Sequence, residues 1–393
     1  MNSGPYNATK RPMSAVLTAF TVVACAIMAA LGVQHQTKLV PGPAVNSHAR
    51  PPQSQDCLDC HEVAEHFDSV PHAQTLRQSG DSEWQKWFVG QSFKAPEGTS
   101  TYHFFESGDG GLLCKNDFYP RPVSVDWLLG SGRHAITPVS TWTNSAGETE
   151  LLELAVSWYP DQGLGLTLGH SAETLRNAVG IDRLGKRLTH GETLECFGCH
   201  STWLPVNDGQ IRFREVDPGV TCNRCHTEAA QHIESDGQLM PVGFSWSKLT
   251  PLESVNRCGN CHRRADQMTT DELTIDNHLL VRFASAAIVQ SHCFLKQDAS
   301  VDSSNERLDC LTCHDPHRPA STDPVFYSNQ CRNCHDVDCS TESPCPELTL
   351  NSNCLPCHMP KSEIHPGLSF TDHWIRTRSE SPNENPSDVD KGR

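Results

Sequence analysis

The sequence predicts a mainly α protein with extensive irregular structure and a small β-containing insertion. The pentapeptide C-x-x-C-H occurs seven times, and six of its copies fall within residues 196–358. Each of these six copies has only about 27 residues of chain around it. The apolar segment 279–289 is typical of a helix. Between the first and second copies, the stretches 137–143 and 151–159 flank a polar turn at 144–147, and this pattern predicts a β-hairpin.

The pentapeptide has the spacing that covalent haem attachment requires. Two cysteines three residues apart can form thioethers with the two vinyl groups of one haem, and the adjacent histidine then reaches the iron as proximal ligand. Random placement of 19 Cys and 21 His in 393 residues gives on the order of 0.05 copies of the motif. Structural zinc sites need no histidine directly after every second cysteine. We therefore expect seven haem c groups per chain, which replace much of the usual apolar core.

The attachment sites follow directly from the motifs, and each site is named below by its first cysteine. The expected covalent attachment residues are Cys57 and Cys60, Cys196 and Cys199, Cys222 and Cys225, Cys258 and Cys261, Cys310 and Cys313, Cys331 and Cys334, and Cys354 and Cys357. The expected proximal iron ligands are His61, His200, His226, His262, His314, His335 and His358.

Longer stretches around three motifs carry a further pattern. They are CNRCHTEAAQH at 222–232, CLTCHDPH at 310–317 and CLPCHMPKSEIHPGLSFTDHWI at 354–375. These stretches resemble the multihaem c-type cytochromes of the cytochrome c-552/554 type, which include chains fused to tetratricopeptide repeats. VDWLLGSGRH at 125–134 and ELAVSWYP at 153–160 are similar to the intervening segment of that group. The resemblance covers about residues 57–375 and implies a fold organised by stacked haems.

The sixth iron ligands are expected to be mostly histidines. Of the 21 histidines, seven belong to motifs and 14 do not, whereas only Met240, Met268 and Met359 lie beyond the amino-terminal apolar segment. Haems with two histidine ligands have lower potentials than haems with a Met/His pair. The resemblance to these cytochromes favours His72 over His66 and His278 over His292 as distal ligands. The expected distal set is His72, His134, His232, His278, His317, His365 and His373.

Five cysteines lie outside the motifs. Cys339 and Cys345 bracket a short loop and could form a disulfide in an oxidising compartment. Cys114 with Cys293 is a second possible pair. The fifth, Cys25, lies in a lipobox-like tetrapeptide that starts at Val22.

The amino-terminal segment predicts export. Residues 1–12 contain Lys10 and Arg11 and precede an apolar run at 13–33, which is long enough to span a bilayer and would leave the amino terminus in the cytoplasm. An uncleaved anchor, a cleaved signal peptide and a lipoprotein attached through Cys25 all remain open. Each of them places the remainder at the periplasmic face of the cytoplasmic membrane.

Composition divides the rest of the chain. Residues 34–56 are rich in proline and predict a flexible linker, and 57–195 hold the first motif and the haem-free insertion. Residues 196–377 form the expected six-haem cytochrome c domain, and 378–393 predict a disordered tail. The tryptophans expected to form a core in the insertion are Trp84, Trp87, Trp127, Trp142 and Trp158.

Charge and motifs limit the function. A net charge of −16 excludes a nucleic-acid binder and suits cationic or dipolar protein partners. No nucleotide-binding glycine loop, G-x-S-x-G or H-E-x-x-H is present. We expect a membrane-tethered periplasmic heptahaem cytochrome that transfers electrons between redox protein partners. The alternative is an oxidoreductase of nitrite or hydroxylamine with one open-coordination haem. In that alternative the insertion histidines shape a pocket; they are His103, His134, His170 and His190.

Overall fold

A computed structural model describes most of the chain beyond residue 54. The described residues are 55–62, 67–80, 82–96, 100–144, 149–227, 229–239, 246–297, 307–335 and 352–378. Contacts divide the chain into Met1–Pro41 and Gly42–Arg393, and every described residue belongs to the second unit. Within these ranges no helix is both long enough and apolar enough to cross a bilayer. The predicted membrane segment, the linker up to residue 54 and the tail from residue 379 lie outside them, as do His66, Cys25, Cys339 and Cys345.

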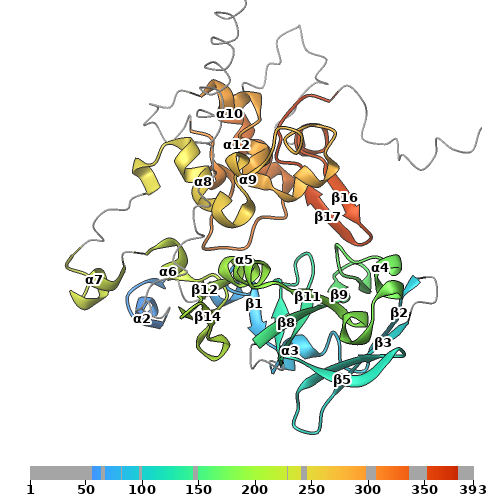
Figure 1. Ribbon diagram of the computed structural model, residues 1–393. Coiled ribbons are helices and arrows are strands. Elements are labelled where there is room, and N and C mark those ends of the chain that lie inside the picture. The colour runs from blue at the N-terminus through green and yellow to red at the C-terminus, as the bar shows by residue number, and fades with distance from the viewer. Residues whose placement is uncertain are drawn as a thin grey trace, which may run out of the picture. The chain divides into compact units, whose positions relative to one another are not determined.

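Residues between the first two motifs form two antiparallel sheets (Figure 1). The five-stranded sheet has the order β1 (Leu76–Gln78), β6 (Trp127–Leu129), β7 (Thr137–Thr143), β8 (Thr149–Leu154) and β11 (Gly185–Leu188). The four-stranded sheet has the order β2 (Ser92–Lys94), β3 (Thr101–Glu106), β4 (Leu112–Asn116) and β5 (Tyr119–Val125). A ribbon of β9 (Val156–Tyr159) and β10 (Gly163–Leu166) and the short helices α3 (Ser82–Gln85) and α4 (Ala172–Asn177) complete this insertion.

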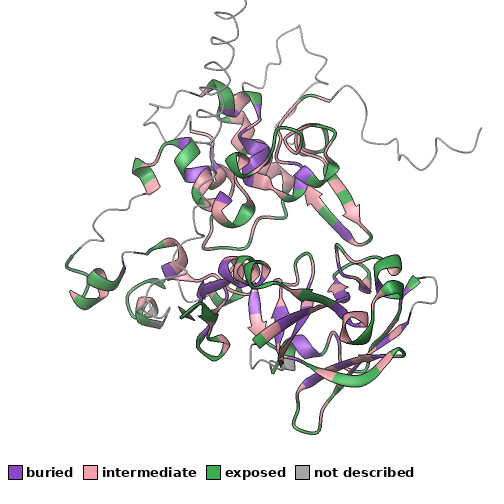
Figure 2. Cartoon of the chain, in the orientation of Figure 1, coloured by how far each residue is buried: buried purple, intermediate pink, exposed green. Residues whose placement is uncertain are grey.

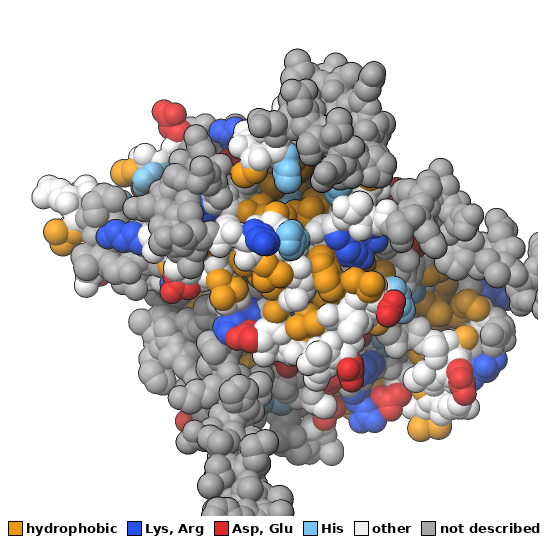
Figure 3. Space-filling view, turned by 90° about the horizontal axis from the view of Figure 1, so that it is seen from above, with side chains coloured by type: hydrophobic (Ala, Val, Ile, Leu, Met, Phe, Trp, Pro, Cys, Tyr) orange, Lys and Arg blue, Asp and Glu red, His pale blue; other side chains and the backbone are white. Residues whose placement is uncertain are grey.

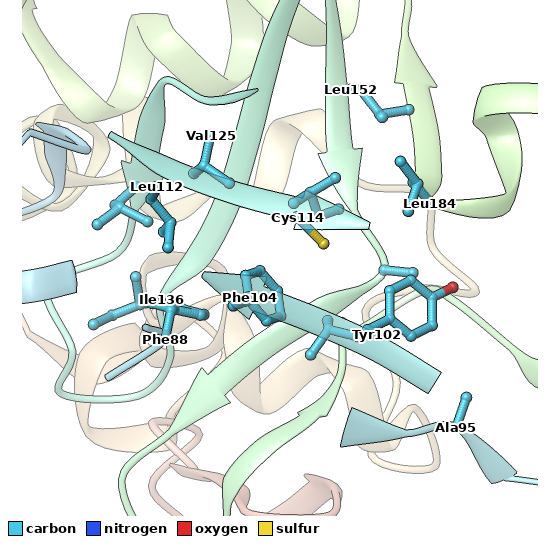
Figure 4. Close-up of a cluster of buried hydrophobic side chains, with 14 of the residues drawn as sticks. Phe88, Ala95, Tyr102, Phe104, Leu112, Cys114, Val125, Ile136, Leu152 and Leu184 are labelled. Carbon is cyan, nitrogen blue, oxygen red and sulfur yellow. The ribbon is translucent and has the colours of Figure 1, made fainter. Parts of the chain in front are cut away.

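The core of the insertion lies between these strands. Successive residues of β3 and β4 alternate between buried and less buried positions, as a strand with one face on a core requires. Tyr102 and Phe104 on β3 and Leu112 and Cys114 on β4 are at most 2% exposed. Figure 4 shows these side chains converging with Phe88, Val125 and Ile136. The insertion therefore has an apolar core of its own.

One of the sequence predictions for the insertion holds in full and a second holds in part. Strands β7 and β8 pair in antiparallel register, with Val139 opposite Glu153 and Thr143 opposite Thr149, so the predicted hairpin is present. Trp87 stacks on Trp158 at 4.3 Å between ring centroids, and Trp84 meets Trp87 edge-on at 4.8 Å. Three of the five predicted tryptophans thus pack in the core of the insertion, whereas Trp127 belongs to a second cluster with Phe197 and Trp142 to none of the clusters among the described residues.

The motif-bearing segments consist mainly of short helices. They are α2 (Gln55–Leu58), α5 (His190–His200), α6 (Cys222–Cys225), α7 (Ala229–Glu234), α8 (Pro251–His262), α9 (Ala284–Ile288), α10 (His292–Lys296), α11 (Cys310–Cys313), α12 (Pro324–Arg332) and α13 (Leu355–His358). The 3-10 turns are η2 (Phe67–Ser69), η4 (Gly180–Arg183), η5 (Phe213–Glu215), η6 (Trp246–Lys248), η7 (Ala265–Gln267) and η8 (His278–Arg282). Two-stranded ribbons join β12 (Ser201–Trp203) to β15 (Asp217–Pro218), β13 (Val206–Asn207) to β14 (Gln210–Ile211), and β16 (Lys361–His365) to β17 (Leu368–Thr371).

The prediction of a mainly α fold is wrong. The strands make sheets of five and four members in addition to the small ribbons, so the β structure is much more than one hairpin. The sequence signal that the prediction did not use is the alternation of polar and apolar residues at 101–104, which becomes β3. The helix expected at 279–289 is also interrupted, because η8 ends at Arg282 and α9 begins at Ala284.

Candidate haem-binding sites

Each C-x-x-C-H motif folds as one helical turn. In five motifs the histidine N–H donates to the carbonyl of the first cysteine, at 2.8 to 3.1 Å between nitrogen and oxygen. The other two motifs end the longer helices α5 and α8. Both of these helices begin with a capping box, formed by Thr189 with Glu192 and by Thr250 with Glu253. This turn places the second cysteine and the histidine one helical turn beyond the first cysteine, so all three side chains lie on one side of the turn.

Four motif histidines face a second histidine from elsewhere in the chain. The ring centroids of these pairs are 6.1 to 6.3 Å apart. The pairs are His61 with His232, His262 with His72, His226 with His317, and His314 with His373. In every pair the second member belongs to the predicted distal set.

This spacing tests whether the residues fit a haem. Two imidazoles that coordinate one iron place their ring centroids about 6.2 Å apart, because each metal–nitrogen bond is about 2.0 Å and each coordinating nitrogen lies about 1.1 Å from its centroid. Imidazoles packed directly against each other would lie closer, as the stacked rings of Trp87 and Trp158 do at 4.3 Å. The four pairs thus leave room for one iron between their rings.

Hydrogen bonds orient the rings of several candidate ligands. The Nδ1–H of His232 donates to the Leu239 carbonyl at 2.8 Å, and that of His373 donates to the Thr371 carbonyl at 2.9 Å. The proximal candidate His200 donates in the same way to the Thr75 carbonyl at 2.9 Å. A histidine that donates from Nδ1 keeps Nε2 as a free metal ligand. These carbonyl partners were not predicted, and nothing in their residue types could have indicated them.

Burial favours the neutral form of several candidate histidine ligands, which is the form that binds a metal. Burial, followed by the neighbouring His72 and His373, lowers the pKa of His262 to about 4. Burial is likewise the largest cause that lowers the pKa of five further candidates: His72, His200, His226, His314 and His373. A neutral imidazole can coordinate iron without first losing a proton.

Segments far apart in the sequence bring His72 to its partner. Val220 N–H donates to the His72 carbonyl at 2.8 Å, and Thr75 Oγ1 donates to the carbonyls of His72 and His200 at 3.0 Å each. The turn after the first motif is thereby fixed beside the second motif. His72 is thus placed opposite His262, which ends α8.

His373 is positioned by residues beside it. Ile375 N–H donates to Ser291 Oγ at 2.8 Å, and the buried Asp372 carboxylate pairs with Arg376 at 3.1 Å and with Arg378. These contacts hold the segment after β17 against the residues that join α9 and α10. The ring of His373 can then face His314 of the Cys310 site.

The other three predicted distal ligands face no motif histidine at this spacing. His134 stacks on Phe370 at 4.7 Å, and His365 stacks on Tyr159 at 5.4 Å. His365 also donates from Nδ1 to the Pro366 carbonyl at 3.1 Å, whereas His278 is exposed at the start of η8. Within the described ranges, three motif histidines have no second imidazole about 6 Å away: His200, His335 and His358.

Thiols of different motifs lie in contact with one another. Hydrogen bonds join Cys57 to Cys222, Cys199 to Cys261, and Cys258 to Cys310. Burial and then the Cys222 thiol raise the pKa of Cys57 to about 11.

Helix contacts continue the series of neighbouring sites. Helix α11 contacts both α8 and α12, and α12 contacts α13, where Cys354 N–H donates to Ser328 Oγ at 3.1 Å. The Cys222 motif also lies beside the Cys258 motif. Burial and then the nearby Cys258 and Cys261 thiols raise the pKa of Cys225 to about 11. The seven motifs therefore form a continuous set of neighbours.

Two of the four insertion histidines contact other residues of the insertion, and His134 stacks on Phe370 outside it. His170 Nε2 lies 3.1 Å from Glu153 Oε2, and His103 contacts Ser92 Oγ at 2.9 Å. A cavity of about 650 Å³ beside β1 is lined by Arg77, Trp84 and nine other residues, none of which is a histidine. The described residues thus give no support to a catalytic pocket built from these histidines.

The cysteines outside the motifs are not bonded to each other where the structure describes them. Cys114 is fully buried on β4, where burial raises its pKa, while Cys293 lies on α10 beside Cys331 and Cys334. Both thiols are free, so the predicted Cys114–Cys293 disulfide is wrong. Cys114 belongs to the apolar core of the insertion, whereas Cys293 lies on α10 among the motif-bearing segments.

Side chains of the kinds that cover a haem face lie together on one surface. Figure 3 shows apolar side chains and histidines side by side on the upper face of the view in Figure 1. Leu295, Leu311 and Phe326 are the exposed large apolar residues of α10, α11 and α12. Exposed apolar groups of this kind mark binding surfaces.

Comparisons with known proteins add little. No protein-family model matches the chain, and no curated protein matches it. Among solved structures, the chain is similar to the outer cell wall cytochrome OcwA, with 14% identity over 83% of this chain and 79% of that one, and a TM-score of 0.43. That neighbour is a cytochrome, but a likeness of this size carries no argument. The haem sites rest on the motifs and on the imidazole pairs.

Proposed function

We propose that this chain is a multihaem c-type cytochrome that transfers electrons between redox proteins at the periplasmic face of the cytoplasmic membrane. One observation carries the proposal. Four motif histidines each face a second histidine with 6.1 to 6.3 Å between ring centroids, which is the spacing of two axial ligands on one iron.

The residues of a paired site have separate tasks. At the Cys222 site, Cys222 and Cys225 would attach the porphyrin through thioethers, and His226 and His317 would hold its iron. When bound, haem c would supply reversible one-electron chemistry. With both histidines as ligands, a small substrate would have no free coordination position at this site.

Contacts between motifs support transfer rather than storage. The Cys57 thiol contacts Cys222, and the Cys258 thiol contacts Cys310, although each pair belongs to two separate motifs. Every thiol in a motif is a point of covalent attachment, so porphyrin edges attached there would lie close together. Electron exchange weakens steeply with distance, and this close approach favours it.

The sequence supports two further parts of the proposal, the protein partners and the membrane tether. A net charge of −16 favours protein partners with a cationic or dipolar docking face. The apolar run at 13–33, as an anchor, would tether the chain to the cytoplasmic membrane, and 34–56 would serve as a linker. We expect seven haem c groups per chain.

The test combines haem quantification with electron paramagnetic resonance (EPR) of the oxidised holoprotein. We expect seven haems per chain by pyridine haemochrome and low-spin signals from the four paired sites. His317→Ala should convert one low-spin haem to a high-spin haem. His278→Ala is the matched control, because this exposed ring faces no motif histidine, and it should leave those four signals unchanged.

Three results would contradict the proposal. An unchanged low-spin spectrum in His317→Ala would remove the pairing on which it rests. A high-spin haem in the unmodified protein that binds nitrite or hydroxylamine would favour the oxidoreductase instead. Haem content well below seven would reject the motif count.

A further inference from the structure

One candidate axial histidine has a charged partner at Nδ1, whereas four others have a neutral carbonyl there. His200, His232, His365 and His373 each donate from Nδ1 to a backbone carbonyl. His317 instead has its Nδ1 3.1 Å from Oδ1 of Asp315. Among the candidate axial ligands in the described ranges, this is the ring with a carboxylate acceptor.

The Asp315 carboxylate is held in place from two sides. Its Oδ1 also accepts the backbone N–H of His317 at 3.0 Å, and its Oδ2 lies 3.5 Å from Nε of Arg318. Arg318 is the cation that faces this carboxylate, and it is mostly exposed, with 77% of its side chain accessible. Asp315 and His317 are themselves 49% and 40% exposed, so water weakens both contacts of the carboxylate; the contact with His317 is the shorter and less exposed of the two.

The ring that Asp315 contacts is well placed to act on iron. His317 faces His226 with 6.1 Å between centroids and 13° between ring planes, the smallest angle of the four pairs. A carboxylate acceptor at Nδ1 draws the N–H proton more strongly than a carbonyl does, which makes Nε2 a stronger electron donor. A stronger donor stabilises ferric iron over ferrous iron and lowers the reduction potential.

We propose that Asp315 is a positioning residue that lowers the reduction potential of the Cys222 site relative to the Cys57 and Cys310 sites. Those two sites are the matched comparison, because their distal rings His232 and His373 have carbonyl partners. The inference rests on the proposed function, since it needs His226 and His317 as axial ligands. It deepens that function, because neighbouring sites with different potentials set where electrons reside in the array.

The test is a spectroelectrochemical titration of the holoprotein with two substitutions at one position. Asp315→Asn replaces the carboxylate by a neutral amide of the same shape, so one potential should become more positive while seven haems remain bound. Asp315→Glu keeps the charge and should restore at least part of the original value. The haem that shifts should be the one whose low-spin EPR signal disappears in His317→Ala.

Two further variants control for general charge effects. Asp323→Asn removes a carboxylate from the same segment, where Asp323 only caps α12, and Asn caps helices about as well as Asp. This control should leave the potential of the Cys222 site unchanged. Arg318→Gln removes the cation facing Asp315 and should shift the same potential in the negative direction.

The outcomes separate this inference from the proposed function. If His317→Ala produces a high-spin haem but Asp315→Asn shifts no potential, or shifts one no more than Asp323→Asn does, the role of Asp315 is rejected and the cytochrome stands. Equal shifts in Asp315→Asn and Asp315→Glu would also reject it. If His317→Ala leaves the spectrum unchanged, the ligand assignment itself fails.

Discussion

In the β insertion, 16 buried residues form one apolar cluster, whereas two clusters confined to the motif-bearing segments contain four and three. Figure 2 shows the same contrast, with buried residues along the insertion strands and mostly intermediate or exposed residues in the motif helices. The insertion therefore has enough apolar contact to hold its own structure. The motif segments have little apolar core of their own, and the proposed haems would supply it.

Preventing haem attachment should produce the largest difference in stability between the insertion and the motif segments. We expect apoprotein, made without haem attachment, to keep amide protection in β3, β4, β7 and β8 and to lose nearly all of it in α8, α11 and α12. The reason is that those helices have few buried apolar neighbours. Hydrogen exchange followed by mass spectrometry, with holoprotein as control, measures this. Equal protection in α8 and β4 of the apoprotein would show that the two regions do not differ.

A core substitution should act on the insertion and spare the haem sites. Phe104 is 2% exposed and packs on Phe88, so Phe104→Ala should destabilise the insertion by about 3–5 kcal/mol. The haem content and the low-spin spectrum should not change. Phe118→Ala is the control, because Phe118 is 53% exposed and its loss should cost about 0.5 kcal/mol or less. Denaturant unfolding followed by far-ultraviolet circular dichroism gives both values.

Substitution of a candidate distal ligand should change the haem spectrum and leave the insertion intact. His72→Ala removes the ring that faces His262, so one low-spin haem should become high-spin and should bind added imidazole, which restores the low-spin signal. The amide protection of β3 and β4 should stay as it is. His103→Ala is the control, because that ring contacts Ser92 and Asp117 within the insertion. A spectrum that His72→Ala leaves unchanged would contradict the pairing.

Local features of the sites could be predicted from the sequence. The three functional residues of a motif fall within one helical turn, so their spacing alone indicates their chemistry. The pairing of distal ligands could not be predicted, because His72 meets His262 across 190 positions and no local signal encodes that contact. The role of the Thr75 carbonyl is of the same kind, since every residue has a carbonyl.

The extent of the β structure could have been predicted better. The first four residues of β3, TYHF, alternate between polar and apolar side chains, which is the strand period of two, and the structure shows the matching burial. The prolines Pro120 and Pro122 argue against a strand in a sheet centre, yet β5 lies at the edge of its sheet, where proline is tolerated. The edge position depends on the order of the strands, which the local sequence does not specify.

The smallest expected effect concerns helix α5, which belongs to both regions. Phe197 of α5 packs edge-on against Trp127 of the insertion at 5.5 Å, while the helix ends in the second haem motif. Thr189 caps this helix by accepting from Glu192 N–H at 3.2 Å. Thr189→Ala should therefore cost about 1 kcal/mol, and Thr189→Ser, which keeps the hydroxyl, should cost much less.

The pH dependence of this effect tests the cap itself. Hydrogen bonds from Lys186 and then from Thr189 lower the pKa of Glu192 from 4.5 to about 2. A carboxylate with a depressed pKa stabilises the fold above its ordinary pKa, and that stabilisation disappears as the pH falls through its folded-state pKa. The stability difference between the unmodified protein and Thr189→Ala should thus narrow between pH 4.5 and about 2. A constant difference over this range would mean that the Thr189 cap stabilises α5 independently of the Glu192 carboxylate.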